Sequence, residues 1–125
     1  MTDIVTHEKI GNIIHVKINA DNVLMSEKVA EINKQLKLLI NSEPKSKLIV
    51  DLAKVQNASS SFFTLLANLQ MYINEKQCKA KYVNLHLNLS DFIELTGLNK
   101  ILDIHATVEK ALVSYSQEIY NVKND

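Results

Sequence analysis

The chain has 125 residues, and its fourteen basic and fourteen acidic side chains give a formal net charge of zero. This length suits one domain, and the charge balance argues against a nucleic acid or an anionic membrane as partner. Cys78 is the single cysteine, no apolar run is long enough to span a bilayer, and the first residues lack a signal-peptide pattern. We therefore expect one cytoplasmic domain over residues 1–125, without direct membrane insertion.

The first half of the chain predicts a β-hairpin, a helix and a strand. Residues 5–18 alternate in polarity on either side of Gly11, a residue that tolerates the positive φ of a tight turn. Residues 26–41 carry apolar side chains at spacings of three and four, which predicts a helix that Ser26 caps. Residues 48–52 are mostly apolar, as in a central strand of a sheet.

The second half alternates helices with strands. Apolar spacing predicts a helix over residues 62–76, and alternating polarity predicts a strand over residues 82–87. Then follow a short helix from Ser90 to Gly97, an edge strand at 102–104, and a helix that Thr107 caps and whose end, residues 121–125, is frayed. This order predicts an α/β fold, with an N-terminal hairpin and a mixed, mainly parallel sheet flanked by about four helices.

The residues that several enzyme classes need are missing. Gly11 and Gly97 are the two glycines, so neither a phosphate-binding loop nor a dinucleotide fingerprint can form. The four histidines lie on separate segments without the spacing of metal ligands. We expect His15 and His86 on strands, either at the surface or with satisfied hydrogen bonds. The sequence thus predicts no catalytic residue, no metal and no cofactor.

A phosphorelay receiver is the competing α/β protein of this length. A receiver needs an aspartate at the end of one strand and a lysine at the end of the last strand. We expect Asp51 inside its strand, and residues 104–106 contain no lysine. Both points argue against a receiver.

Two segments resemble a known family. Residues 48–66 combine an apolar strand containing Asp51, a short turn, and three serines that open an apolar helix. Residues 91–102 contain the run Leu-Thr-Gly-Leu at the expected end of a helix. Both segments and their spacing are similar to the STAS family of the bacterial anti-sigma-factor antagonists, in which Asp-Ser-Ser-Gly opens the second helix.

The resemblance implies a non-catalytic, regulatory module that binds a partner protein. In the antagonist branch, an anti-sigma factor that is also a serine kinase phosphorylates a serine at the start of the second helix, and the phosphorylated module releases it. By position that serine is Ser60, with Ser59 and Ser61 as neighbours. A helix start tolerates a phosphate, whereas a partner packed on it would meet a new dianion. The same serines also suit a simple helix cap, and this alternative stays open.

The chain departs from the family pattern on the face that would meet a kinase. Ser59 stands where the family has Asp, Phe62 stands where it has Gly, and in residues 20–23 the usual acidic position is lost, with Asp21 two places away from it. A second implied function is therefore an accessory subunit of an ABC-type lipid transporter, which binds the transporter ATPase without a phosphorylation cycle. A ligand-binding or catalytic domain ranks last, and the oligomeric state stays open. Besides the serines, we expect an exposed partner-binding surface made of Asn22, Val23, Leu24, Met25, Phe62 and Phe63.

Overall fold

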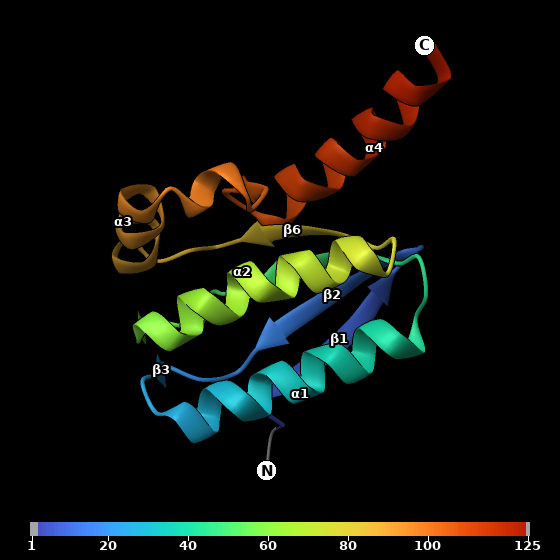
Figure 1. Ribbon diagram of the computed structural model, residues 1–125. Coiled ribbons are helices and arrows are strands. Elements are labelled where there is room, and N and C mark those ends of the chain that lie inside the picture. Colours follow the sequence, from blue (N-terminus) through green and yellow to red (C-terminus); the bar gives the residue numbers. More distant parts are fainter. Residues whose placement is uncertain (1–2, 125) are drawn as a thin grey trace.

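A five-stranded sheet forms the centre of the molecule in this computed structural model, which describes the backbone of residues 3–124 and the side chains of residues 3–118 (Figure 1). The strand order is β1-β2-β4-β6-β7; β1 pairs antiparallel with β2, and every other pair is parallel. The expected mixed, mainly parallel sheet is confirmed. Its strands are β1 (Val5–Ile10), β2 (Ile13–Ile18), β4 (Lys47–Asp51), β6 (Lys79–Val83) and β7 (Ile104–His105).

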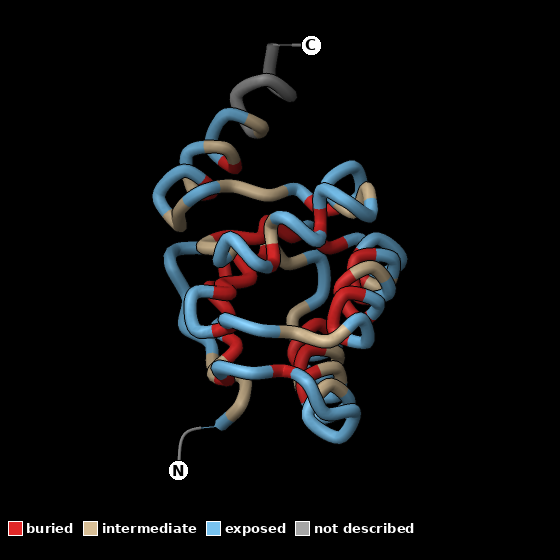
Figure 2. The backbone as a smooth tube through the Cα atoms, turned by 90° about the vertical axis from the view of Figure 1, so that its left-hand side faces the viewer, coloured by how far each residue is buried: buried red, intermediate tan, exposed pale blue. Residues whose placement is uncertain are grey.

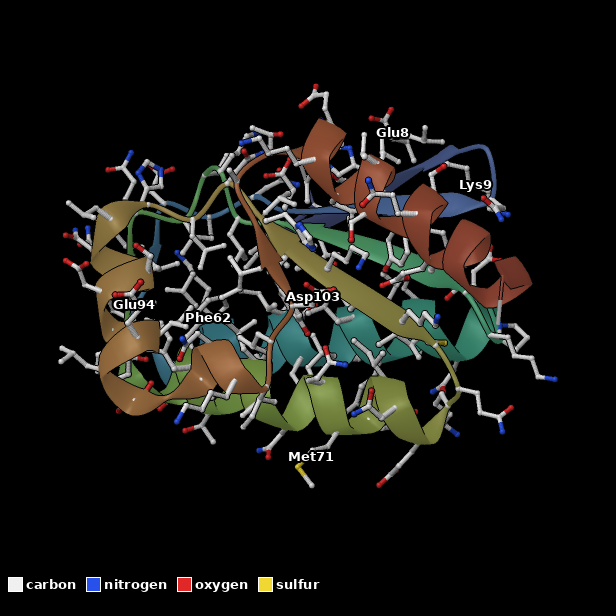
Figure 3. All side chains as sticks on the ribbon, turned by 90° about the horizontal axis from the view of Figure 1, so that it is seen from above. Glu8, Lys9, Phe62, Met71, Glu94 and Asp103 are labelled. Atoms are coloured by element: carbon white, nitrogen blue, oxygen red, sulfur yellow. The ribbon has the colours of Figure 1, made fainter. Side chains whose placement is uncertain are left out.

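Four α-helices flank this sheet, as expected. They are α1 (Ser26–Ser42), α2 (Ser60–Glu75), α3 (Leu87–Thr96) and α4 (Val108–Asn124), and a 3-10 turn, η1 (Leu98–Lys100), follows α3. Helices α1 and α2 lie on one face of the sheet and α4 lies on the other (Figure 3). The side chains of the tail expected to fray, residues 121–125, lie outside the described part of the chain.

Burial follows this layering, because α1 and α2 turn their buried residues inward and their exposed residues outward (Figure 2). The larger core lies between the sheet and these two helices, with α3 closing one end. A smaller core lies under α4, around Ile49, Val83, Ala111 and Tyr115. The hydroxyl of Tyr115 donates a 2.7 Å hydrogen bond to the carbonyl oxygen of Leu48, which ties α4 to the central strand.

The hairpin turn at Gly11 is confirmed, with a φ of 61°. The cap at the start of α4 is confirmed as well, because Thr107 Oγ1 accepts a 3.2 Å hydrogen bond from the backbone N–H of Lys110. Gly97 ends α3 with a φ of 77°, in the left-handed conformation expected of a helix C-cap.

Several local predictions are wrong. The strand expected at residues 82–87 ends at Val83, because Asn84 adopts a φ of 60° that breaks the extended backbone. Helix α3 therefore begins at Leu87 instead of Ser90, and His86 lies at its N-cap instead of on a strand. Ser26 does not cap α1, since it is the first residue of that helix and follows the N-cap, Met25.

The prediction that Asp51 lies inside its strand is also wrong. Asp51 is the last residue of β4, where its side chain accepts a hydrogen bond from the backbone N–H of Ala53, which begins the next turn. An aspartate that accepts a bond from the backbone two residues later favours a turn over a continued strand.

Candidate functional site

The segments that the sequence predicts as a partner-binding surface meet at one end of the molecule. They are joined by two short strands, β3 (Asn22–Val23) and β5 (Asn57–Ala58), which pair in parallel apart from the main sheet. The backbone N–H of Ser59 donates a 2.9 Å hydrogen bond to the carbonyl oxygen of Val23. The start of α2 therefore lies beside the segment that leads into α1.

Val23, Phe62 and Phe63 do not belong to the exposed surface, so the sequence prediction is wrong for these three residues. Val23 and Phe62 are fully buried in the larger core, and Phe62 lies inside the molecule (Figure 3). Phe63 stacks on Phe92 of α3, with 4.2 Å between the ring centroids. The reason is that Phe62 points into the larger core and Phe63 packs against α3, an arrangement that a helical pattern alone does not reveal. The ring at the family's glycine position thus fills the core and leaves the outer surface unobstructed.

Asn22, Leu24 and Met25 are exposed as expected, and Leu24 and Met25 keep 56% and 65% of their surface accessible. Beside them runs a row of three asparagine side chains. Asn57 Nδ2 donates to Asn22 Oδ1 at 2.8 Å, and Asn88 Nδ2 donates to Asn57 Oδ1 at 3.5 Å. We call Asn22, Asn57 and Asn88 the asparagine row.

Sequence reasoning missed the α3 side of this surface. Leu87, next to the asparagine row in α3, keeps 72% of its surface exposed. The sequence predicts a strand over residues 82–87, which places Leu87 in the sheet and leaves Asn88 unassigned. The positive φ of Asn84 ends that strand early, and an Asn in such a position is the one sequence signal that favoured a turn there. The result is an uncharged row of amides with exposed apolar residues on both sides.

The three serines adopt different environments at the start of α2. Ser59 is the N-cap residue by backbone conformation, yet its hydroxyl makes no capping bond and its oxygen is buried without a partner. Ser60 and Ser61 belong to the first turn and are exposed. No side chain caps α2, and no acidic residue lies in its first turn. No hydrogen bond therefore supports the alternative that these serines only cap the helix.

Behind this surface lies a buried hydrogen-bond network centred on Asp51. His15 Nε2 donates to Asp51 Oδ2 at 2.8 Å, while Asp51 Oδ1 accepts from the Ala53 N–H and from Asn84 Nδ2. Burial raises the pKa of the Asp51 carboxyl, but these hydrogen bonds together outweigh burial and hold the pKa below its ordinary value. His15 is thus a satisfied histidine, as the sequence predicted.

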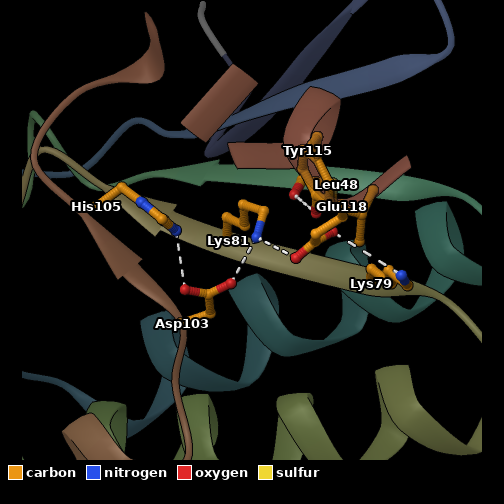
Figure 4. Close-up of polar contacts among 7 residues, drawn as sticks. All are labelled: Leu48, Lys79, Lys81, Asp103, His105, Tyr115 and Glu118. Carbon is orange, nitrogen blue, oxygen red and sulfur yellow. Dashed lines mark hydrogen bonds and ion pairs between the residues drawn. The ribbon is translucent and has the colours of Figure 1, made fainter. Parts of the chain in front are cut away.

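A second polar cluster fixes α4 on the other side of the molecule (Figure 4). The ammonium of Lys81 in β6 is 2.6 Å from Asp103 Oδ2 and 2.8 Å from Glu118 Oε1, and it lies over the ring of Tyr115. Burial lowers the pKa of Lys81, but the two carboxylates outweigh burial and raise the pKa above its ordinary value. This cluster joins β6, α4 and the turn before β7, and it lies away from the start of α2.

Within the described residues, no three or more His, Cys, Asp or Glu side chains gather as metal ligands. None of the helices described is both long and apolar enough to cross a membrane.

The sequence matches the STAS domain family model over residues 4–111. That span is most of the chain, and the chain belongs to the STAS domain family. A search of curated protein sequences finds no match.

Solved structures with the same fold include anti-sigma factor antagonists and part of an anion transporter. An anti-sigma factor antagonist from Mycobacterium paratuberculosis is 19% identical, with a TM-score of 0.74 over 88% of this chain and 91% of that one. The Bacillus cell fate determinant SpoIIAA in its phosphorylated form is 13% identical, with a TM-score of 0.65 over 89% and 98%. A murine solute carrier anion transporter is 13% identical, with a TM-score of 0.76 over 88% of this chain but 18% of that chain. At these identities the likeness establishes the fold.

Proposed function

We propose that this STAS domain is a non-catalytic regulatory module that binds a partner protein in the manner of an anti-sigma-factor antagonist. The observation that supports this most is the exposed Ser60 in the uncapped first turn of α2, beside the asparagine row and the exposed Leu24 and Met25. The partner we expect is an anti-sigma factor that is also a serine kinase. The similar structures of an anti-sigma factor antagonist and of SpoIIAA support the same class of function.

Phosphorylation of Ser60 would switch such a complex by charge. A phosphate adds about −1.5 to −2 charges at neutral pH. The positive end of the α2 dipole and the absence of acidic residues in the first turn favour that charge in the free module. A partner that covers Ser60 would have to desolvate the dianion next to apolar Leu24 and Met25, so phosphorylation releases the partner.

The test is affinity capture from the native cells with three baits, namely wild type, Ser60→Ala and Ser60→Asp, followed by mass spectrometry. We expect wild type and Ser60→Ala to capture a kinase-fold anti-sigma factor, and Ser60→Asp to lose it. Ser61→Asp is the matched control, since it places the same charge one residue further along an exposed turn. Equal capture by Ser60→Asp and wild type would show that the charge switch does not operate.

An accessory subunit of an ABC-type lipid transporter is the second candidate. The observation in its favour is that this fold also occurs as a small part of a murine anion transporter. In that case the same baits would retain a transporter ATPase, all three would bind equally, and Ser60 would be unmodified.

A further inference from the structure

The central sheet has one long edge that, among the described residues, no other strand covers. β1 lies at the end of the strand order, next to α1 (Figure 1), whereas the strand at the opposite edge, β7, has only two residues. All six residues of β1 pair with β2 in a continuous register, without a bulge or a proline. Short strands, bulges and prolines are the usual devices that keep an edge from pairing, so β1 is open to another strand.

Alternate residues of β1 turn their backbone groups away from β2. The N–H of Asn19 donates a 2.7 Å hydrogen bond to the carbonyl oxygen of Ile4, just before β1 and in the same register. Hydrogen-bonded and non-hydrogen-bonded positions alternate along an antiparallel pair, so Val5, His7 and Lys9 present their N–H and C=O groups to the outside. Beyond the sheet itself, no backbone hydrogen bond of the described residues reaches these three.

An apolar hollow lies beside this edge, on the face of the sheet that α1 covers. Val5 of β1 and Leu38 and Leu39 of α1 line it, and its volume is about 380 Å³. Leu38 keeps 59% of its surface accessible there. Lys9, the one lysine of β1, lies with its ammonium 3.3 Å from Glu43 Oε1, so its charge is directed along its own chain. The edge therefore suits a strand that brings an apolar helix face with it.

The β1 strand of a second copy of this chain meets that requirement. A two-fold axis perpendicular to the sheet keeps each face continuous, so it must pass between two copies of the same residue. With the axis at His7, Val5 lies opposite Lys9 of the second copy, and all outward-facing residues bond to each other. This register forms about six main-chain hydrogen bonds, whereas an axis one residue away forms about four.

The side chains favour the same register. The axis at His7 places the hydroxyl of Thr6 opposite the carboxylate of Glu8 from the second copy, a pair that can form a hydrogen bond. An axis at Glu8 would place two carboxylates directly opposite each other, which is destabilising. The axis at His7 also brings the two α1 helices side by side on one face, with Leu38 of each copy at the hollow of the other. A net charge of zero does not oppose this association.

We propose that the chain forms a two-fold dimer through the outer edge of β1, antiparallel about an axis at His7, so that the central sheet continues from one copy into the other. This interface shares no residue with the candidate partner surface, and it does not depend on the proposed function.

The test is sedimentation equilibrium of the full chain. Since small interfaces give weak complexes, we expect the mass to rise from one chain toward two as the concentration rises from about 1 μM to about 500 μM. A mass of one chain at the highest concentration would overturn the proposal and leave the edge to a strand of a different protein.

Two substitutions at His7 test the role of its backbone. His7→Pro removes the outward-facing N–H, a position where edge strands tolerate proline. Because the two-fold axis doubles the change, the dimer loses two hydrogen bonds, and its dissociation constant should rise at least about tenfold. His7→Ala is the matched control, because it keeps the N–H and should change the dissociation constant less than about threefold.

Leu38→Asp tests the interface without altering the strand. It places a carboxylate at the apolar hollow and should weaken the dimer at least about tenfold while the circular dichroism spectrum stays that of the wild type. A dimer whose affinity is unchanged in both Leu38→Asp and His7→Pro would overturn the proposal, because association would then use another surface.

Cross-linking in a Cys78→Ala background tests the register. His7→Cys should form a disulfide between two copies, since Cα atoms across a hydrogen-bonded antiparallel pair lie about 5.5 Å apart, within the span of a disulfide. Lys9→Cys is the control, because the axis at His7 separates the two copies of that position by about 13 Å along the strands. Equal cross-linking of the two variants would contradict the proposed register. None of these measurements needs the partner of the proposed function, so they succeed or fail independently of the capture experiment.

Discussion

The ring of Phe62 is fully buried at a position where the family pattern has glycine. It forms an edge-to-face pair with the ring of Phe63, which in turn stacks on Phe92 of α3. These three rings join α2 to α3 directly beneath the candidate surface. A residue that departs from the family motif thus contributes to the core that holds the surface in place.

Phe62→Ala tests this contribution. Removing a buried phenylalanine ring loses its transfer free energy and leaves a cavity, so we expect the free energy of unfolding to fall by about 3–5 kcal/mol. Urea denaturation followed by circular dichroism measures the change. Met71→Ala on the same helix is the control, because Met71 points into solvent (Figure 3) and its loss should cost about 0.5 kcal/mol or less. Similar losses in the two variants would contradict the buried position of Phe62.

Because of Asp51, the free energy of unfolding depends on pH in the acidic range. Its pKa is below the ordinary value in the folded chain, so the folded state binds the proton less readily than the unfolded state does. The stabilisation is therefore fully present above the ordinary carboxyl pKa of about 3.9, and it is lost as pH falls through the lower, folded-state pKa. We expect wild type to lose more stability than Asp51→Asn when urea midpoints are compared between about pH 5 and pH 3. Parallel curves for the two proteins would argue against an ionised, hydrogen-bonded Asp51.

At the scale of the elements, the start of α2 and the start of α4 differ in their capping. Thr107 Oγ1 accepts the N–H of Lys110, whereas the hydroxyl of Ser59 makes no capping bond. We expect Thr107→Ala to lower the free energy of unfolding by about 1 kcal/mol. Ser59→Ala should be neutral or stabilising, because it removes a buried oxygen without a partner. Thermal denaturation of both variants checks this, and a larger loss for Ser59→Ala would show that Ser59 caps α2.

Helix α4 depends on Lys81 for its attachment to the sheet. Lys81→Met should leave Asp103 and Glu118 repelling each other, and because both carboxylates remain partly exposed we expect a loss of about 1–3 kcal/mol. Amide exchange in residues 108–118 should accelerate more than exchange in α1. Since the pKa of Lys81 is raised, its stabilisation is present below the ordinary lysine pKa and disappears as pH rises through the folded-state value.

Lys79→Met is the matched control for that prediction. Lys79 is an exposed lysine of the same strand, and its ammonium lies 3.9 Å from Glu118 Oε2. Exposed ion pairs contribute little, so we expect a change below about 0.5 kcal/mol. If the two methionine variants behave alike, burial of Lys81 has no part in holding α4.

At the scale of the whole molecule, periodicity predicted the order of strands and helices because burial on one face repeats along each element. It failed where single residues end an element, as Asn84 and Asp51 do through the turn conformations they favour. The candidate surface was predictable in part. Leu24, Met25 and Ser60 were named correctly as exposed, whereas the inward positions of Phe62 and Phe63 depend on where α3 packs.

The asparagine row could not be predicted, because it depends on the pairing of two strands of two residues each that are far apart in the sequence. Strands so short have no periodicity to detect. The row decides the extent of the candidate surface, since it connects the start of α1 with the start of α3. A surface that includes Leu87 is broader than one confined to the start of α2.

Charge substitutions on both sides of the row test that extent. Leu24→Asp and Leu87→Asp should each weaken capture of the partner at least tenfold, because a central apolar contact typically contributes more than about 1 kcal/mol and a buried carboxylate adds a desolvation cost. Both side chains are exposed in the free chain, so thermal stability should stay close to that of wild type. Leu38→Asp is the control, since Leu38 is equally exposed but lies near the other end of α1, beside β1. If only Leu24→Asp loses capture, the surface is confined to the α1 side. If Leu87→Asp loses capture as well, α3 is part of the interface, which the serine motif alone does not reveal.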